Sequence, residues 1–204
     1  AISGTGDFSQ GTIPSTCSRN VNAGFSIVSY TGNNTSGATV GHGLSETPEL
    51  IIIKNLEATV DWIVYSEPVG PTKGLQLNGD GEAYDYAAYF NDTAPTASLF
   101  SLGDYSGVNA VEDMIAYCFH SIEGYSKVGS YIGNGLADGV FIYTGFEPAY
   151  VMSKYIGVAD DWRIMDTARS TYNVATKRLY ANTNAVEFDG ASQSKDFLSN
   201  GFKI

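Results

Sequence analysis

The chain has 204 residues, with 11 basic and 22 acidic side chains and a formal net charge of −11 at pH 7. This balance argues against nucleic acid and against an anionic membrane surface as partners, because both attract proteins through Lys and Arg. Hydrophobic residues make up 43% of the chain, which excludes global disorder, and no apolar run approaches the roughly 20 residues of a membrane-spanning helix. We therefore expect one large or two small globular domains.

The composition favours an all-β protein. Charged residues are only 16% of the chain, against roughly 25% in an average soluble domain. The chain is instead rich in Gly (23 residues) and Tyr (14 residues). Glycine serves tight turns and tyrosine serves strands, so we predict a β-sandwich of jelly-roll type with many turns.

Residues 1–23 differ from the rest, because Gly, Ser and Thr dominate and apolar residues show no periodicity. This segment is predicted to be an N-terminal arm, a linker or an edge strand. Beyond it, short segments of β character alternate with Gly- and Asn-rich turns. The predicted strands, in chain order, are Phe25–Tyr30, Glu49–Asn55, Asp61–Ser66, Lys73–Asn78, Met114–His120, Gly139–Thr144, Ala149–Lys154, Asp161–Asp166, Lys177–Asn182 and Phe197–Ile204.

The chain also resembles itself with a period of about 100 residues. Matching pairs keep the same order along both halves: Gly24-Phe25-Ser26 with Gly124-Tyr125-Ser126, Pro48 with Pro148, Lys54 with Lys154, Asp61-Trp62 with Asp161-Trp162, and Lys73 with Lys177. We predict two copies of one β unit, residues 24–103 and 124–204, joined by a connecting segment at 104–123. The copies form either tandem sandwiches or two halves of one larger sandwich.

Trp62 and Trp162 are the only tryptophans and occupy equivalent places in the two copies. A tryptophan buries a large apolar surface, so both are predicted to be structural anchors of a core between sheets. The acids before them, Asp61 and Asp161, are candidates to pair with the equivalent lysines Lys54 and Lys154.

The sequence contains no legible catalytic motif and no metal-ligand spacing. Cys17 and Cys118 are far apart in the chain and are expected to remain unbridged, and the histidines His42 and His120 are expected to be structural or surface residues. Residues 78–82 resemble half of a calcium loop, but Ala83 stands where such a loop needs glycine. We therefore predict an acidic turn there, no cofactor, no metal and no enzymatic activity.

The remaining functional signal is an excess of aromatic residues in the variable loop of the first copy, at Tyr84, Tyr86, Tyr89 and Phe90. Tyr84, Tyr86 and Phe90 share a parity and would line one face of an extended segment. Exposed tyrosines stack on sugar rings and contribute to protein interfaces. These four residues are the candidate glycan- or partner-binding site, and an ordinary β core is the alternative.

Residues 24–204 resemble a domain found in virion proteins of marine bacteriophages. The resemblance rests on Gly24–Asn33, Gly41–Leu44, Pro48–Asn55, Asp61–Tyr65, Ala116–Lys127 and Asp196–Lys203. Such domains are described as tail-fibre-like or structural, and some accompany lectin-like β-sandwiches.

The resemblance implies a non-enzymatic structural protein on the virion surface, either in a tail fibre or as a capsid decoration or knob. Its partners would be other virion proteins and further copies of itself, in a trimer. The alternative functions are a carbohydrate-binding module that recognises a host surface glycan and, less favoured, a glycan depolymerase.

Overall fold

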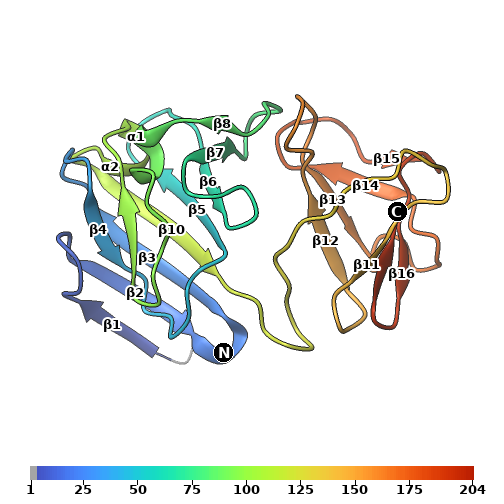
Figure 1. The fold of residues 1–204 in the computed structure, drawn as a ribbon, viewed down its shortest axis with the longest axis horizontal. Coiled ribbons are helices and arrows are strands. Elements are labelled where there is room, and N and C mark those ends of the chain that lie inside the picture. Colours follow the sequence, from blue (N-terminus) through green and yellow to red (C-terminus); the bar gives the residue numbers. More distant parts are fainter. Residues whose placement is uncertain (1–3) are drawn as a thin grey trace.

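The structure, a computed structural model, describes residues 4–204 and forms two lobes (Figure 1). Strands β1 to β10 build the first lobe, and strands β11 to β17 build the second. Every paired strand is antiparallel to its neighbour. The predicted all-β sandwich is confirmed.

An eight-stranded sheet forms the main layer of the first lobe. Its strands, in spatial order, are β1 (Gly4–Phe8), β2 (Ser15–Asn20), β3 (Phe25–Thr31), β10 (Asp113–Phe119), β5 (Leu50–Asn55), β6 (Ile63–Ser66), β7 (Lys73–Gln76) and β8 (Tyr84–Asp85). A short 3-10 helix, η1 (Val21–Ala23), connects β2 to β3. Gly24 ends this helix at φ 64°, a left-handed conformation that glycine adopts without strain.

The second layer of this lobe covers one face of the sheet. It consists of the strand pair β4 (Ala38–Gly41) and β9 (Leu99–Leu102) and the one-turn helices α1 (Ala87–Phe90) and α2 (Ser106–Asn109). Strand β10 alternates buried and partly exposed residues, as a half-covered strand does. Its buried residues join Val28, Ile51 and Phe100 in one hydrophobic core.

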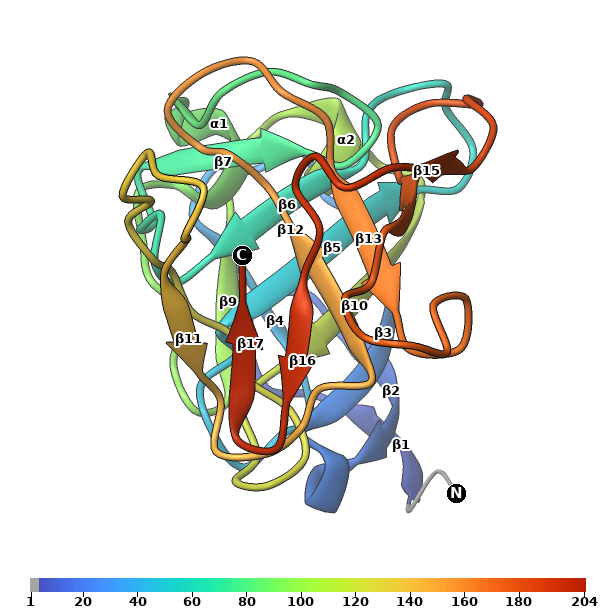
Figure 2. The same cartoon turned by 90° about the vertical axis from the view of Figure 1, so that its right-hand side faces the viewer.

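The second lobe is a smaller sandwich (Figure 2). One sheet contains β12 (Tyr150–Ser153), β13 (Arg163–Asp166), β14 (Lys177–Tyr180) and β15 (Phe188–Asp189). The other contains β11 (Phe141–Tyr143), β17 (Gly201–Lys203) and β16 (Asp196–Leu198). Met165, Ala175, Phe197 and Phe202 form the core of this lobe.

A third apolar cluster joins the two lobes. Ile52, Val64 and Leu75 of the eight-stranded sheet pack with Trp162 of the second lobe. Successive strand residues point to opposite faces, and the neighbours of Ile52 on β5 lie in the core of the first lobe. Ile52 therefore marks the opposite face of the eight-stranded sheet, and the second lobe packs on that face.

The two segments outside the predicted repeat units contribute strands to the eight-stranded sheet of the first lobe. Residues 4–8 and 15–20 form β1 and β2, which extend the sheet at one edge. The described part of the predicted arm is thus an edge-strand pair, and residues 1–3 lie outside the described residues. The predicted connecting segment 104–123 supplies α2 and β10, and β10 lies in the middle of the sheet between β3 and β5.

The two halves share strand order and local contacts. Strands β5 to β8 are arranged as β12 to β15 are, and β4 pairs with β9 as β11 pairs with β17. The backbone N–H of Trp62 donates to Asn78 Oδ1 at 2.9 Å, and that of Trp162 donates to Asn182 Oδ1 at 3.0 Å. These are contacts that a duplicated unit requires, and the duplication itself stays a prediction.

The expected pairing of the equivalent acids and lysines is wrong. Asp61 and Asp161 accept hydrogen bonds from the side-chain amides of the same two asparagines, at 2.9 and 2.7 Å. Lys54 and Lys154 each donate to two backbone carbonyls instead. The amide is the nearer partner because it lies on the adjacent strand end, opposite the Asp-Trp pair.

Candidate functional site

The four predicted site residues divide into an exposed pair and a buried pair. Tyr84 and Tyr86 are 38% and 42% exposed, whereas Tyr89 and Phe90 are 1% and 2% exposed. A side chain without accessible surface cannot stack on a ligand. Tyr89 and Phe90 are therefore core residues, and the candidate binding surface narrows to Tyr84 and Tyr86.

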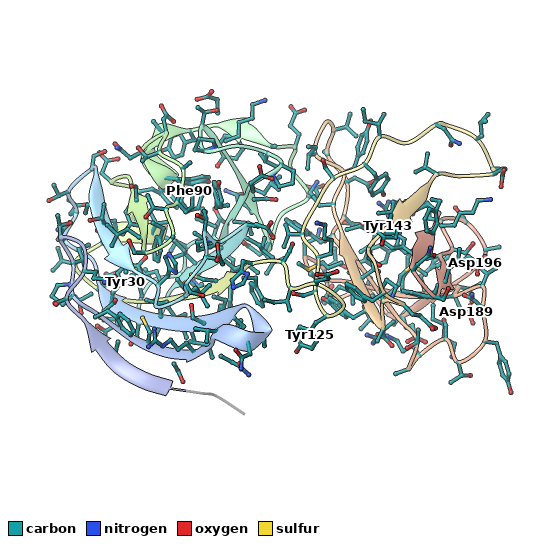
Figure 3. All side chains as sticks on the ribbon, turned by 60° about the horizontal axis from the view of Figure 1, so that its bottom comes forward. Tyr30, Phe90, Tyr125, Tyr143, Asp189 and Asp196 are labelled. Atoms are coloured by element: carbon teal, nitrogen blue, oxygen red, sulfur yellow. The ribbon has the colours of Figure 1, made fainter. Side chains whose placement is uncertain are left out.

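Tyr89 and Phe90 are buried, and Tyr84 and Tyr86 exposed, because the backbone conformation changes within the loop. The extended segment ends at Tyr86, which is the N-terminal cap of α1, so the two-residue parity does not reach Phe90. The helical turn directs Phe90 into the first lobe (Figure 3). Its ring meets that of Tyr65 edge-on, with the centroids 5.5 Å apart. Tyr89 lies against Gly74, where a Cβ atom would come within 2.4 Å of the tyrosine ring.

The exposed pair belongs to a tyrosine cluster, which we define as Tyr84, Tyr86, Tyr89 and Tyr105. The Tyr84 and Tyr86 ring centroids are 6.0 Å apart, and buried Tyr89 lies beneath both, at 5.6 and 4.8 Å. Tyr105 packs edge-on against Tyr89 at 5.1 Å and against Tyr86 at 6.1 Å. Edge-to-face contacts of this kind fix ring orientations, so the exposed rings are held in place from below.

Polar groups surround the phenol hydroxyls. The Gln76 side-chain amide donates to Asp61 Oδ2 at 2.9 Å, to Tyr89 Oη at 3.1 Å and to Tyr84 Oη at 3.4 Å. The hydroxyls of Tyr84 and Tyr89 also bond to each other. Burial, and then the nearby Asp61 carboxylate, raise the pKa of Tyr105, and burial raises the pKa of Tyr89. Both phenols are therefore neutral hydrogen-bonding groups at neutral pH.

The exposed tyrosines and the polar groups beside them are chemically suited to binding a ligand such as a sugar. Tyr84 and Tyr86 offer ring surface for stacking, and Asp61 and Gln76 beside them offer hydrogen-bond acceptors and donors. Sequence reasoning missed Asp61, Gln76 and Tyr105 as members of this surface. Asp61 lies just before β6, Gln76 is on β7 and Tyr105 is in the predicted connecting segment, and no local pattern in the sequence brings them to the loop.

Both tryptophans pack in the cluster between the lobes. Trp162 is buried, and Trp62 is partly buried against the same cluster. The indole Nε1 of Trp162 donates to the backbone carbonyl of Gln76 at 2.9 Å. Their contacts are those of structural anchors between sheets.

The acidic turn at residues 78–82 also has structural contacts. Asn78 bonds to the backbone of Trp62 and to the carboxylate of Asp61. The backbone carbonyl of Asp80 accepts from Lys154 Nζ at 3.0 Å and from Asp160 N at 2.8 Å. This turn therefore joins the two lobes. Among residues 4–204, no group of three or more His, Cys, Asp or Glu residues is placed to hold a metal ion.

The cysteines and histidines occupy the interior. Cys17 and Cys118 are buried free thiols, and burial raises the pKa of both. A buried thiol with a raised pKa is unreactive. His42 and His120 are also buried, and each ring bonds to a backbone carbonyl, so neither is a surface residue.

Fold and site together define an all-β protein of stacked antiparallel sheets that carries a tyrosine cluster on its first lobe. The chain belongs to a family described as a domain of unknown function (DUF7483), whose model matches residues 2–204. Comparison with curated proteins and with solved structures finds no match. No helix in the described part of the chain is long and apolar enough to cross a membrane.

Proposed function

We propose that this chain is a non-enzymatic structural protein of a bacteriophage virion surface, which assembles with further copies of itself, as a trimer, and with other virion proteins. The virion assignment rests on the resemblance of residues 24–204 to virion domains. The observation that supports the assembly is a pair of edge strands in the second lobe that expose aromatic side chains.

Strands β11 and β12 are each paired on one side only within the described residues, with β17 and β13 respectively. They expose Phe141, Tyr143 and Tyr150, which are 46%, 68% and 54% accessible. In the first lobe, β5 holds the place equivalent to β12, and it is paired on both sides, by β6 and β10. An unpaired strand edge with exposed aromatic residues is a template for pairing with another chain.

The assembly is tested by the mass of the purified protein in solution. Wild type is expected to run at about three times the 21.8 kDa of one chain in sedimentation equilibrium. The double variant Tyr143→Lys/Tyr150→Lys places charge on both edges and is expected to be monomeric. Tyr172→Lys, at an exposed loop tyrosine, is the matched control and is expected to keep the wild-type mass. A monomeric wild type at micromolar concentration would contradict the assembly.

The virion role is tested separately by gold-labelled antibody imaging of intact source particles. Label over the icosahedral shell supports a decoration or knob protein. Label on the tail or fibre supports a role in host adsorption. Particles that carry no label, although the antibody binds the purified protein, would overturn the virion assignment.

A second candidate function is recognition of a host surface glycan by Tyr84 and Tyr86. The observation that favours it is that these rings are exposed, held from below by Tyr89, and flanked by Asp61 and Gln76. Aromatic rings beside amide and carboxylate groups provide both stacking and hydrogen bonds for a sugar.

A glycan array tests this candidate. The wild-type protein is expected to bind a defined glycan, and Tyr86→Ala is expected to weaken binding at least tenfold. Tyr172→Ala is the control for loss of an exposed tyrosine elsewhere and is expected to bind normally. If the wild-type protein binds nothing on a broad array, glycan recognition is contradicted and the structural role is the one function that remains proposed.

A further inference from the structure

Cationic side chains gather on one face of a sheet in the second lobe, in a chain that has only 11 Lys and Arg residues. Arg163 on β13 lies opposite Tyr180 on β14, and Arg178 precedes Tyr180 by two residues. Both arginines therefore project from the same face of the four-stranded sheet. Met165 shares that face with Arg163 and lies in the core between the two sheets, so this is the inner face of the small sandwich.

Lys195 approaches the same region from the segment before β16. It is 3% exposed, and its backbone pairs with Ala175 in both directions, at 2.8 and 3.0 Å. Its ammonium group lies 5.7 Å from the ring centroid of Phe202. Within residues 4–204, the structure shows no hydrogen bond or ion pair for this ammonium group.

The arginines leave most of this charge uncompensated. Arg178 is 6% exposed, stacks on Phe188 at 4.0 Å, and donates to the neutral hydroxyl of Tyr180 at 2.8 Å and to the backbone carbonyl of Ser192, neither of which carries a charge. Arg163 pairs with Asp160 at 2.7 Å, but its buried Nε has no hydrogen-bond partner. The three cations thus share one carboxylate among the described residues.

Burying three cationic side chains beside one carboxylate costs free energy when no anion is bound. Burying a charged group that has no partner is strongly unfavourable. Burial, and then the charges of Arg163 and Arg178, lower the pKa of Lys195 to about 8. The ammonium is still mainly protonated at pH 7, and no carboxylate of the described residues pairs with it.

We propose that the second lobe binds a small oxyanion, a sulfate, phosphate or carboxylate group, between Lys195, Arg163 and Arg178. The oxygens of such a group accept hydrogen bonds from the Lys195 ammonium and from the free Nε of Arg163. The rings of Phe188 and Phe202 lie beside these cations. Aromatic walls lower the local dielectric and strengthen the attraction. Because Lys195 is almost fully buried, the site accepts a free ion or the charged end group of a larger ligand.

The site is tested by isothermal titration calorimetry. The full chain is titrated with inorganic sulfate and with inorganic phosphate in buffer of constant ionic strength. Saturable binding is expected for wild type and at least a tenfold loss for Lys195→Met, which removes the charge and keeps an unbranched apolar side chain. Lys177→Met is the matched control, since this lysine neighbours Arg178 on β14 and so points to the opposite face of the sheet, with a side chain 41% exposed. It is expected to bind as wild type does.

Two further arms make the result decisive. Titration with glucose 6-sulfate, and with glucose as the uncharged control, identifies the source of the anion. Binding of glucose 6-sulfate but not of glucose supports the charged end group of a sugar as the ligand. Binding of inorganic sulfate alone supports a free ion. If Lys195→Met does not fold by circular dichroism, Arg163→Gln carries the test with the same expected loss. Absence of binding of all three anions to wild type at millimolar concentration would overturn the proposal, as would equal binding by a folded variant.

Discussion

Trp162 donates its indole N–H to the backbone carbonyl of Gln76 across the contact between the lobes, at 2.9 Å. The side chain of the same Gln76 bonds to Asp61, Tyr84 and Tyr89. One residue of β7 therefore connects the packing of the second lobe to the tyrosine cluster of the first. The orientation of the candidate binding surface depends on how the two lobes pack.

We expect Trp162→Phe to lower the free energy of unfolding by about 1–3 kcal/mol, because it removes the indole hydrogen bond to the Gln76 carbonyl, which still accepts from the N–H of Gly79. Trp62→Phe is the matched control: Trp62 is only partly buried, and no hydrogen bond of its indole N–H is observed, so a smaller loss is expected. Urea unfolding followed by circular dichroism measures both. Equal losses in the two variants would contradict the role assigned to the indole hydrogen bond.

Much of the fold was predictable because local pattern determines it. The local pattern predicts strands at Glu49–Asn55 and Met114–His120, and the structure has strands at Leu50–Asn55 and Asp113–Phe119. The position of β10 was not predictable. It pairs with β3 and with β5, which are distant in the sequence. The residues of a single strand do not determine which strands will pair with it. The same limit applies to β1 and β2, whose Gly-, Ser- and Thr-rich sequence has no apolar periodicity.

The candidate site was predictable only in part, for a related reason. The aromatic residues of the loop are visible in the sequence, but parity counting fails where α1 interrupts the extended segment after Tyr86. Burial then separates Tyr89 and Phe90 from Tyr84 and Tyr86. The polar partners Asp61, just before β6, and Gln76, on β7, come from other parts of the chain, so only the tertiary structure shows that they meet the tyrosines.

This division predicts different consequences for two aromatic residues that are close in the sequence. Phe90→Ala leaves a cavity in the core of the first lobe and is expected to cost about 3–5 kcal/mol of stability. Tyr86→Ala removes a half-exposed ring and is expected to cost under about 1 kcal/mol. Denaturant midpoints of the two variants against wild type check the difference. A larger loss for Tyr86→Ala than for Phe90→Ala would refute the assignment of core and surface.

Asn109, at the end of α2, is expected to be the most sensitive polar residue of the first lobe. Its buried side chain donates to the carbonyls of Gly103 and Thr35, at 2.7 and 3.0 Å, and accepts from the N–H of Asn33 at 2.9 Å. Asn109→Ala removes all three hydrogen bonds of this buried amide, including the donor to the buried Gly103 carbonyl, and is expected to cost about 3 kcal/mol. Thermal and urea unfolding measure it.

The matched control is Asn134→Ala, because Asn134 is exposed and its hydrogen bonds lie within one turn. A loss below about 0.5 kcal/mol is expected there, as for most surface substitutions. Comparable losses at Asn109 and Asn134 would show that burial does not set the cost of losing these amides.

His42 is expected to make stability depend on pH below about pH 6.5. The buried ring accepts a hydrogen bond from Leu44 N–H at Nδ1, 3.2 Å away, which leaves Nε2 to donate to the Thr96 carbonyl at 3.1 Å. This is the neutral tautomer, and protonation of Nδ1 would break the bond to Leu44. Burial lowers the pKa of His42 below its usual value of 6.5, and the charge of His120 acts in the same direction.

Below pH 6.5 the unfolded chain therefore binds a proton that the folded chain does not, so the free energy of unfolding falls as the pH drops, by at most about 1.4 kcal/mol per pH unit from this one group. Above pH 6.5 this contribution is constant. Urea unfolding at pH 5.5 and 7.5 measures the difference, and this window lies above the range in which ordinary carboxylates titrate. His42→Gln keeps a side-chain amide but has no titrating group, so it is expected to be less stable than wild type at pH 7.5 and to lose less stability on acidification. An identical pH dependence in wild type and His42→Gln would show that another group is responsible.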